Sequence, residues 1–463
     1  MTELTGLTLK QLLERYRART LSPLEYWLAL EDHIAAWEPV IHALYAYDPD
    51  GARAMAKAST ERWARGAPQG PLDGVPVSLK ELIATRGVPV PMGTRAVDPV
   101  PAAADAPIAA RLREDGAVIF AKTTCPDYGM LSSGLSSFHA LSRNPWNPTC
   151  NPGGSSAGAA AAAAAGYGPL HIGTDIGGSV RLPAGWTGVF GFKPSLGRIP
   201  IDPYYVGRCA GPMTRTVEDA ARAMATLTRP DPRDDTSLPP NSIDWLDLAV
   251  DVRGLRIGLM LDAGCGLPVE AAVRDVVIAA ADRFAAAGAI IEPVGPVLTR
   301  AMLDGLDDFW RAKFWGEIGA LDPARRALIL PFIRDWAEGG AAITGVRAAA
   351  GFNQTLAMRR ACGRLFQHVD AVLSPTNPIV CYPADWASPT NDPARPFEHI
   401  AFTVPWNMSE QPAASINGGF SVSGLPIGVQ IVGPRHDDLR VLRLARAFET
   451  WTGGVTTWPR RPG

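Results

Sequence analysis

Two glycine-rich turns that each contain serine carry the most chemically specific pattern in the sequence. The first is Asn151–Gly158, with the sequence NPGGSSAG, and the second is Gly173–Arg181, with the sequence GTDIGGSVR. Glycine lets the backbone approach a ligand closely and turn several N–H groups toward one point. A serine in such a turn lies beside those donors, which is the arrangement that acyl transfer requires: a hydroxyl nucleophile next to an oxyanion hole. A single turn of this kind is commonly structural, but two in tandem favour a catalytic site.

A serine nucleophile also needs a base, and the sequence offers two kinds. His171 lies just before the second turn, and His436 is followed by two aspartates. The other kind is a neutral lysine. Lys80 ends the apolar segment Gly74–Lys80, with the sequence GVPVSLK, where burial would lower its pKa. A lysine at a strand end is often only a surface residue, so the residues alone leave both kinds of base open.

Regular elements alternate along the chain around these turns. Apolar runs predict strands, and apolar residues at three- and four-residue spacing predict helices. Residues 8–65 and 300–366 are predicted to be helical, and the alanine-rich segment after 158 is a further helix. The predicted strands are Val75–Leu79, Ala117–Ala121, Leu170–Asp175, Arg256–Met260, Ala289–Val294 and Leu425–Val432. The other predicted helices are Ala106–Glu114, Thr216–Leu227, Val269–Ala287 and Asp438–Thr450. This alternation favours an α/β sheet covered on both faces.

Taken together, several segments resemble the amidase signature family. They are 70–80 (GPLDGVPVSLK), 151–156 (NPGGSS), 173–183 (GTDIGGSVRLP), 191–195 (GFKPS), 211–217 (GPMTRTV) and 424–430 (GLPIGVQ). Their order and spacing also match, with 75 residues from Lys80 to Ser155 and 24 more to Ser179. The resemblance runs from about residue 8 to the end of the chain.

The resemblance implies a single large α/β domain over residues 1–463, with a central mixed sheet covered by helices on both faces. Within it we expect an N-terminal helical segment at 1–65 and the signature core at 66–230. A helical and irregular insertion at 300–400 is expected to shape the substrate cleft.

The resemblance also implies a Ser–cis-Ser–Lys triad and an acyl-enzyme. Lys80 would be the base, Ser179 the nucleophile, and Ser155 the bridging serine after a cis bond from Gly154. The oxyanion would be held by the backbone N–H groups of Ile176, Gly177, Gly178 and Ser179. Supporting positions are Ser156, Thr174, Asp175 and Arg181, and Gly129 and Met130 match a segment that lines the family's cleft.

Two of these supporting positions have roles that the sequence leaves partly open. Thr174 is expected to hydrogen-bond the serine pair. Arg181 is expected to form an ion pair with Asp175 that holds the nucleophile turn, and the alternative is that Arg181 binds a carboxylate of the substrate.

The substrate pocket is expected to come from residues 125–140, 300–345 and 376–410. Residues 125–140 hold no basic residue except His139, and Arg181 is the only evident carboxylate clamp. We therefore expect hydrolysis of neutral, fairly apolar amides or anilides. Carbamates (urethanes) and esters pass through a similar tetrahedral oxyanion and are possible further substrates. Trp310, Phe314, Trp315 and Trp336 recur at helical spacing, which first of all indicates packing.

Two other interpretations compete with this one. Gly154–Gly158 (GSSAG) fits the G-x-S-x-G pattern of an α/β-hydrolase, with Ser156 as nucleophile and His436 as base. That interpretation leaves Lys80 and the second turn unexplained. The other alternative is a non-catalytic subunit of an amide-transfer complex, against which the intact set of Lys80, Ser155 and Ser179 argues.

Composition narrows the partners and the compartment. The net charge is −2, the pI about 6.4 and the hydrophobic content 47%, so nucleic acid and a membrane are not expected as partners. No apolar run is long enough to span a bilayer, and Met1–Glu3 lacks the pattern of a signal peptide. The six cysteines are scattered without a zinc or disulfide pattern. We expect a cytoplasmic monomer or homodimer that acts on a small-molecule amide or carbamate, without cofactor or metal.

Overall fold

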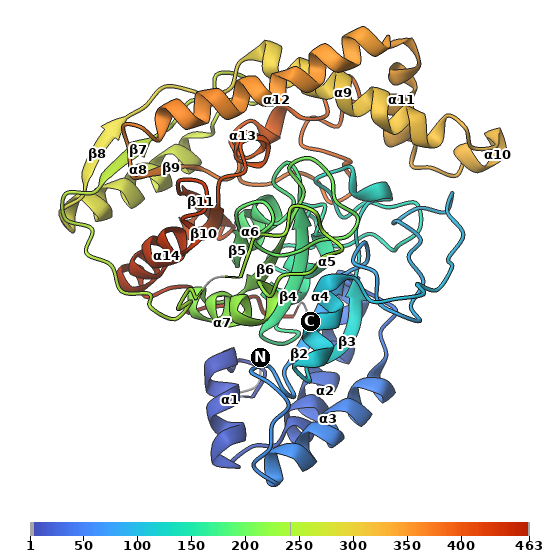
Figure 1. The fold of residues 1–463 in the computed structure, drawn as a ribbon, viewed down its shortest axis with the longest axis vertical. Helices are drawn as coiled ribbons and strands as arrows, with labels where there is room; N and C mark the ends of the chain where they lie inside the picture. The colour runs from blue at the N-terminus through green and yellow to red at the C-terminus, as the bar shows by residue number, and fades with distance from the viewer. Residues whose placement is uncertain (1–3, 241, 462–463) are drawn as a thin grey trace.

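A mixed sheet of 11 strands runs through the whole molecule (Figure 1). The computed structural model describes residues 4–240 and 242–461, so Met1–Glu3, on which the signal-peptide prediction rests, lies outside it. In spatial order the strands are β1 (Leu44–Tyr45), β3 (Val118–Thr123), β2 (Pro76–Lys80), β4 (Leu170–Asp175), β6 (Cys209–Thr214), β5 (Phe190–Lys193), β10 (Ala413–Phe420), β11 (Pro426–Val432), β9 (Ala371–Pro375), β7 (Arg256–Leu259) and β8 (Ile290–Pro293). The α/β class and the mixed central sheet are confirmed.

Three parallel strands at the centre of the N-terminal half position the catalytic candidates. β2 lies between β3 and β4 and is parallel to both. All residues of these three strands are buried, which explains their nearly continuous apolar runs. Val77 pairs with Leu170 and Leu79 with Ile172. The carboxyl ends of β2 and β4 therefore meet at one edge of the sheet, where Lys80 and Asp175 end their strands.

Helices cover both faces of this sheet. Strand β3 shows the division, because Val118 and Phe120 pack with α2 and α5, whereas Ile119 packs with α4 and α7. The first face carries α2 (Pro23–Ile41), α3 (Pro49–Ala64), α5 (Ala157–Ala165) and α6 (Arg181–Thr187). The second carries α4 (Pro107–Glu114), α7 (Val217–Leu227), α8 (Ala271–Ala286) and α14 (Asp438–Thr452), with α1 (Leu9–Ala18) packed on α7.

Helix α5 is fully buried and follows directly after the first serine-containing turn. It consists of alanine with one glycine, Gly158, and alanine is the best helix former. Small side chains let the helix lie close to the sheet. A Cβ at Gly158 would lie 2.2 Å from the carbonyl oxygen of Ala43. The alanine-rich sequence therefore allows α5 to hold the turn before it against the sheet.

A second group of helices lies at the end of the molecule opposite α1–α3 (Figure 1). It consists of α9 (Arg300–Ile318), α10 (Pro323–Arg326), α11 (Pro331–Glu338) and α12 (Gly345–Leu365), with the short α13 (Val404–Met408) packed on α12. Short 3₁₀ helices lie at Asp127–Gly129, Gly339–Ala342 and Glu398–Ile400. Trp310, Phe314 and Trp336 are buried within this group.

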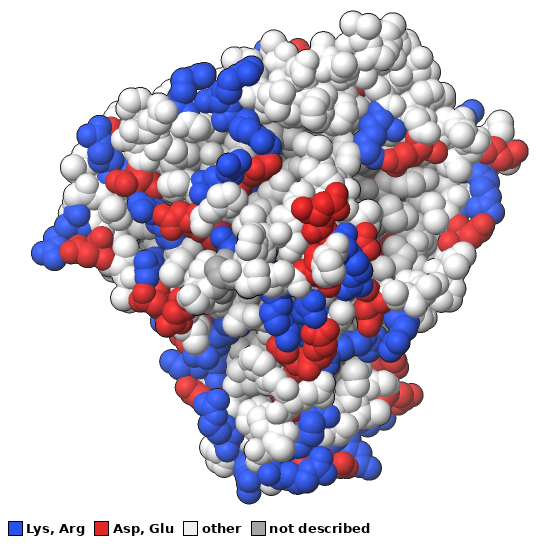
Figure 2. Space-filling view, viewed as in Figure 1, with Lys and Arg blue, Asp and Glu red and all other residues white. Residues whose placement is uncertain are grey.

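The surface carries charges of both signs. Figure 2 shows Lys and Arg interspersed with Asp and Glu over the face in view. No helix in residues 4–240 and 242–461 has the length and apolar character needed to cross a membrane.

Candidate active site

Lys80, the last residue of β2, is fully buried and points at the first serine-containing turn. Its Nζ donates hydrogen bonds to Ser155 Oγ at 2.7 Å and to Thr174 Oγ1 at 3.0 Å. Its side chain is 0% exposed, and burial lowers its pKa from 10.5 to about 8. Once Lys80 is neutral, the contact with Ser155 allows Nζ to accept the hydroxyl proton.

Ser155 lies in a loop that the side chain of Asn151 stabilises through hydrogen bonds. The Asn151 Oδ1 atom accepts hydrogen bonds from the backbone N–H groups of Gly153 and Gly134. Its Nδ2 atom donates to Ser133 Oγ at 2.8 Å and to the carbonyl oxygen of Ala384 at 2.9 Å. The Gly154–Ser155 peptide bond is cis, the geometry that the resemblance led us to expect.

Ser179 lies in the turn between β4 and α6 and faces the same space as Ser155. It is 8% exposed, and both serines line one cleft. Within the described chain, its hydroxyl makes no hydrogen bond, so the two serine hydroxyls are not hydrogen-bonded to each other in this structure. Catalytic hydrogen bonds are often long in structures without substrate. The hydroxyl of Ser179 is thus unengaged and accessible from the cleft.

The turn before Ser179 presents backbone N–H groups, as an oxyanion hole requires. Among the described residues, the N–H groups of Ile176, Gly177 and Ser179 have no hydrogen-bond acceptor. Gly178 differs, because its N–H donates to Asp175 Oδ1 at 2.8 Å. Its φ of +129° also suits glycine alone. The structure therefore removes Gly178 from the expected donors and leaves the other three.

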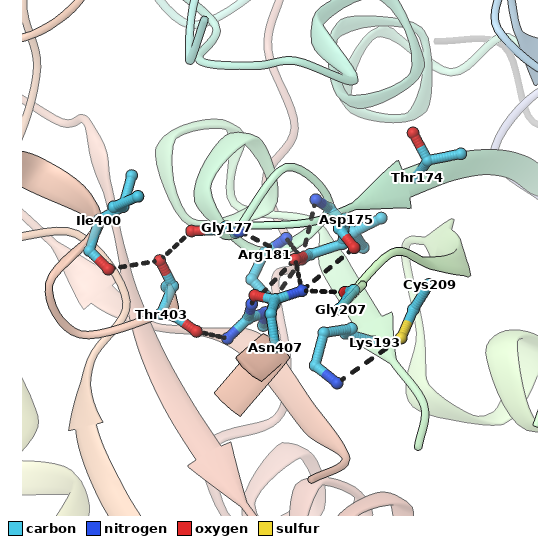
Figure 3. A network of polar contacts seen from close by, with 12 residues as sticks. Thr174, Asp175, Gly177, Arg181, Lys193, Gly207, Cys209, Ile400, Thr403 and Asn407 are labelled. Atoms are coloured by element: carbon cyan, nitrogen blue, oxygen red, sulfur yellow. Dashed lines mark hydrogen bonds and ion pairs between the residues drawn. The ribbon is translucent and has the colours of Figure 1, made fainter. Parts of the chain in front are cut away.

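A buried ion pair between Asp175 and Arg181 holds this turn (Figure 3). Both side chains are 0% exposed. Arg181 Nε and Nη2 donate to the two carboxylate oxygens at 3.0 and 2.9 Å. Burial alone would raise the pKa of Asp175, but the charge of Arg181 and its hydrogen bonds hold that pKa well below the usual range.

The remaining donors of Arg181 are also used inside the protein. Nη1 donates to the carbonyl oxygen of Thr403 at 2.9 Å and to Gln430 Oε1 at 2.7 Å, and Nη2 donates to Asn407 Oδ1 at 2.5 Å. All five N–H groups of Arg181 are therefore occupied, and the side chain does not line the cleft. This geometry favours the structural role over binding of a substrate carboxylate.

The contacts of Ser156 do not suit a nucleophile, and the Thr174 hydroxyl does not bind the serines. Ser156 is 0% exposed, and its Oγ bonds to both the N–H and the carbonyl oxygen of Thr174. The Thr174 hydroxyl contacts Lys80 rather than the serine pair, which corrects that prediction. In the described part of the chain, no hydrogen bond links Ser156 with His436, so the α/β-hydrolase arrangement is not assembled.

The cleft in front of the two serines has a volume of about 690 Å³ and a mainly apolar wall. Gly129 and Met130 line it, as expected. A Cβ at Gly129 would lie 3.5 Å from Ser155 Oγ, so glycine keeps the approach to that hydroxyl open. Other lining residues are Leu82, Val90, Met92, Tyr128, Trp310, Phe314, Phe397 and Ile400. An aromatic or aliphatic group would fill this space well.

Two cleft segments were missed by the sequence analysis. One is the irregular chain after Lys80, which contributes side chains between Leu82 and Ala102. The other is the loop 202–208, which contributes Tyr204, Tyr205 and Arg208. Both segments contain little helix or strand. Their position between matched motifs was the only feature of the sequence that could have placed them in the cleft. Trp315 and Trp336 do not line the cleft and serve packing instead.

One cluster next to Lys80 has the residue types of a metal site. The ligand atoms of Glu81, Cys125 and His139 all lie within 4.8 Å of one another. However, His139 Nε2 already contacts Glu81 Oε2 at 2.6 Å, and the N–H of Gly93 donates to the same oxygen. Burial also raises the pKa of the Cys125 thiol well above its usual value, which disfavours the thiolate that a metal would need. These contacts describe an internal polar cluster.

Comparison with known proteins assigns the family. The family model described as Amidase matches residues 25–442. The chain belongs to the amidase signature family. The predicted membership is therefore confirmed over nearly the whole chain.

Individual members of the family resemble the chain at moderate identity. The glutamyl-tRNA(Gln) amidotransferase A subunit of Chloroflexus aurantiacus is 34% identical over 495 residues, covering 99% of each chain. The protein of that name from Myxococcus xanthus is 33% identical, covering 96% of this chain and 97% of its own. A crystal structure of a bacterial aryl acylamidase of the amidase signature family matches with a TM-score of 0.88, 31% identity and 96% of both chains.

Proposed function

We propose that this amidase signature enzyme hydrolyses the C–N bond of fairly apolar amides or anilides, with Ser179 as nucleophile. The observation that carries the proposal is the 2.7 Å contact between buried Lys80 and Ser155, at the end of an apolar cleft that Ser179 also lines. A lysine with a pKa of about 8 is neutral often enough near neutral pH to act as a base.

The reaction begins with a proton relay. Neutral Lys80 takes the hydroxyl proton of Ser155, which takes that of Ser179, and Ser179 Oγ attacks the carbonyl carbon. The negative charge that develops on the carbonyl oxygen is stabilised by free N–H groups of Ile176, Gly177 and Ser179.

The relay then runs in reverse. Protonated Lys80 returns the proton through Ser155 to the leaving nitrogen, the C–N bond breaks, and an acyl group remains on Ser179. A water molecule loses a proton to the same base and attacks the acyl carbon. The C–O bond to Ser179 then breaks, which releases a carboxylic acid and restores the serine hydroxyl.

The lining of the cleft supports the substrate class. Tyr128 and Phe314 pack edge to face at 4.9 Å between ring centroids, and Trp310 packs against Phe397 at 5.1 Å. Such a wall suits an aryl or alkyl group on either side of the amide. The named activity of the aryl acylamidase neighbour agrees with this class. Aryl carbamates and esters should react as well, because they share the tetrahedral oxyanion.

A second candidate function is glutamine-dependent amide transfer. It rests on the names of the curated relatives, which are amidotransferase A subunits. Against it, glutamine is a small polar zwitterion, whereas the cleft is large and mainly apolar. We also expect the enzyme to act alone, as a cytoplasmic monomer or homodimer, without a cofactor, nucleic acid or membrane.

The test is hydrolysis by the purified chain of a panel comprising benzamide, acetanilide, an aryl carbamate, a nitrophenyl ester and glutamine. We expect turnover of acetanilide, with amide turnover lost in Ser179→Ala and Lys80→Ala while both variants remain folded. Ammonia from glutamine, with no turnover of acetanilide, would instead support amide transfer.

A further inference from the structure

Arg208 is a cation in the cleft without a carboxylate partner. It lies in the loop that leads into β6, is half-buried and lines the cleft together with Ser155 and Ser179. Its Nη1 donates to the carbonyl oxygen of Pro203 at 2.8 Å. Its other guanidinium N–H groups make no hydrogen bond within the described chain, and no described carboxylate lies within ion-pair distance.

The other cation that lines the cleft differs in this respect. Lys313 contacts the carboxylate of Glu317 on the same helix, and its Nζ lies 4.6 Å from the ring centre of Tyr205. Its charge is therefore compensated by groups of the protein. Arg208 has only the more distant charge of Asp202, which also lines the cleft.

The environment of Arg208 makes an anionic ligand favourable. Burial lowers its pKa to about 10, so the guanidinium remains charged at neutral pH although part of its hydration is lost. Its charge also reaches the reaction centre, since it contributes to the lowered pKa of Lys80. A carboxylate bound to Arg208 would lie in the cleft that Ser155 and Ser179 also line, and it would supply the negative partner that Arg208 lacks.

We propose that Arg208 binds a carboxylate of the substrate, so that the cleft prefers amides with an apolar body and one acidic group. The inference rests on the proposed function and narrows its substrate class. Neutral amides were expected because residues 125–140 hold no basic residue except His139 and because Arg181 was the only evident carboxylate clamp. Arg181 has all five N–H groups occupied. Arg208, in contrast, has guanidinium N–H groups that make no hydrogen bond within the described chain. It lies in a loop that the sequence did not predict to line the cleft.

Two matched pairs of substrates test this on the whole chain. On the acyl side, glutaranilic acid is compared with the analogue in which an isopropyl group replaces the carboxylate. On the amine side, para-acetamidobenzoate is compared with para-isopropylacetanilide. Aniline or arylamine release gives kcat/KM for each, in wild type, Arg208→Gln, Arg208→Lys and Asp202→Asn.

The quantity compared is the ratio of kcat/KM between the acid and its neutral partner. In at least one pair we expect a wild-type ratio above one that falls about 10-fold or more in Arg208→Gln, as for loss of a charge-assisted hydrogen bond. Arg208→Lys should keep part of it, and Asp202→Asn, which removes a competing negative charge, should not lower it. Ratios that are equal in wild type and Arg208→Gln, or below one in wild type for both pairs, would overturn the proposal.

The same experiment separates this inference from the function on which it rests. Turnover of the neutral anilides that is lost in Ser179→Ala supports the proposed function whatever Arg208 does. If Arg208→Gln lowers kcat/KM equally for acid and neutral partner, Arg208 only supports the loop through Pro203, and the carboxylate site is wrong. Failure to hydrolyse any of the four compounds overturns both proposals.

Discussion

Amidase activity should rise with pH through about 8, because only neutral Lys80 can accept the proton of Ser155. The perturbation is a change of pH, and its sign follows from the burial of the lysine, which lowers its pKa from 10.5 to about 8. At pH 7 a group with that pKa is neutral in about one molecule in ten, compared with about 0.03% for an ordinary lysine. We therefore expect log kcat/KM to fall by about one unit per pH unit below 8 and to level off above it.

The assay is the initial rate on a neutral anilide from about pH 6 to about pH 10, with circular dichroism to confirm that the fold persists. A second buried lysine, Lys122, has a pKa lowered to about 7 by burial and could imitate the transition. Thr174→Val distinguishes the two. Thr174 Oγ1 accepts a hydrogen bond from Lys80 but not from Lys122, which contacts Ile83 and Thr85.

Removing that acceptor destabilises the charged form of Lys80, so the midpoint in Thr174→Val should move to lower pH. A midpoint that stays in place would assign the transition to another group. A rate that is flat over the whole range, or a midpoint near 10.5 in wild type, would refute the argument that burial prepares Lys80 as the base.

Three substitutions test other parts of the site. Arg181→Gln leaves the buried carboxylate of Asp175 unpaired and should lower the free energy of unfolding by ~3–5 kcal/mol in urea titrations; a much smaller loss would mean that the ion pair does not hold the turn. Ser156→Ala removes a buried hydroxyl and should cost about 1 kcal/mol of stability while turnover survives, whereas Ser155→Ala should lose it; the reverse outcome would revive the α/β-hydrolase interpretation. Phe314→Leu should raise the KM for acetanilide several-fold and leave that for acetamide nearly unchanged, and equal effects on both would place the aryl group elsewhere.

The strands that carry Lys80 and Asp175 were predictable because each is a short, mainly apolar run with few polar interruptions, such as Ser78 in β2 and His171 in β4. Leu170–Asp175 matches β4 at both ends, and Val75–Leu79 differs from β2 by one residue at each end. These strands are buried on both faces, so composition alone marks them.

Strands β1, β5, β6, β9 and β10 were not predicted, although β5 and β6 overlap matched motifs. β6 contains Gly211 and Pro212, and β10 contains Gly418 and Gly419, so neither shows a strand pattern. Their pairing is set by long-range contacts. β10 pairs with both β5 and β11, and Gln430 of β11 accepts a hydrogen bond from Arg181. No local sequence pattern indicates this contact.

The candidate site was predictable where residue type determines the chemistry and unpredictable where packing does. Lys80, Ser155 and Ser179 followed from their motifs. Two features of the site depend on the direction of individual groups in irregular loops. They are the hydrogen bond from the Gly178 N–H to Asp175 and the guanidinium N–H groups of Arg208 that lack an acceptor in the described chain. A linear pattern does not encode those directions.

The most direct test of the central claim is to locate the acyl group. The enzyme is incubated with a slowly hydrolysed aryl carbamate, quenched in acid and digested by cleavage before aspartate, which at Asp175 separates Ser179 from Ser155 and Ser156. We expect the carbamoyl mass on the peptide that begins at Asp175, and no adduct in Ser179→Ala. An adduct on the peptide that contains Ser155 and Ser156, or one that persists in Ser179→Ala, would contradict the account.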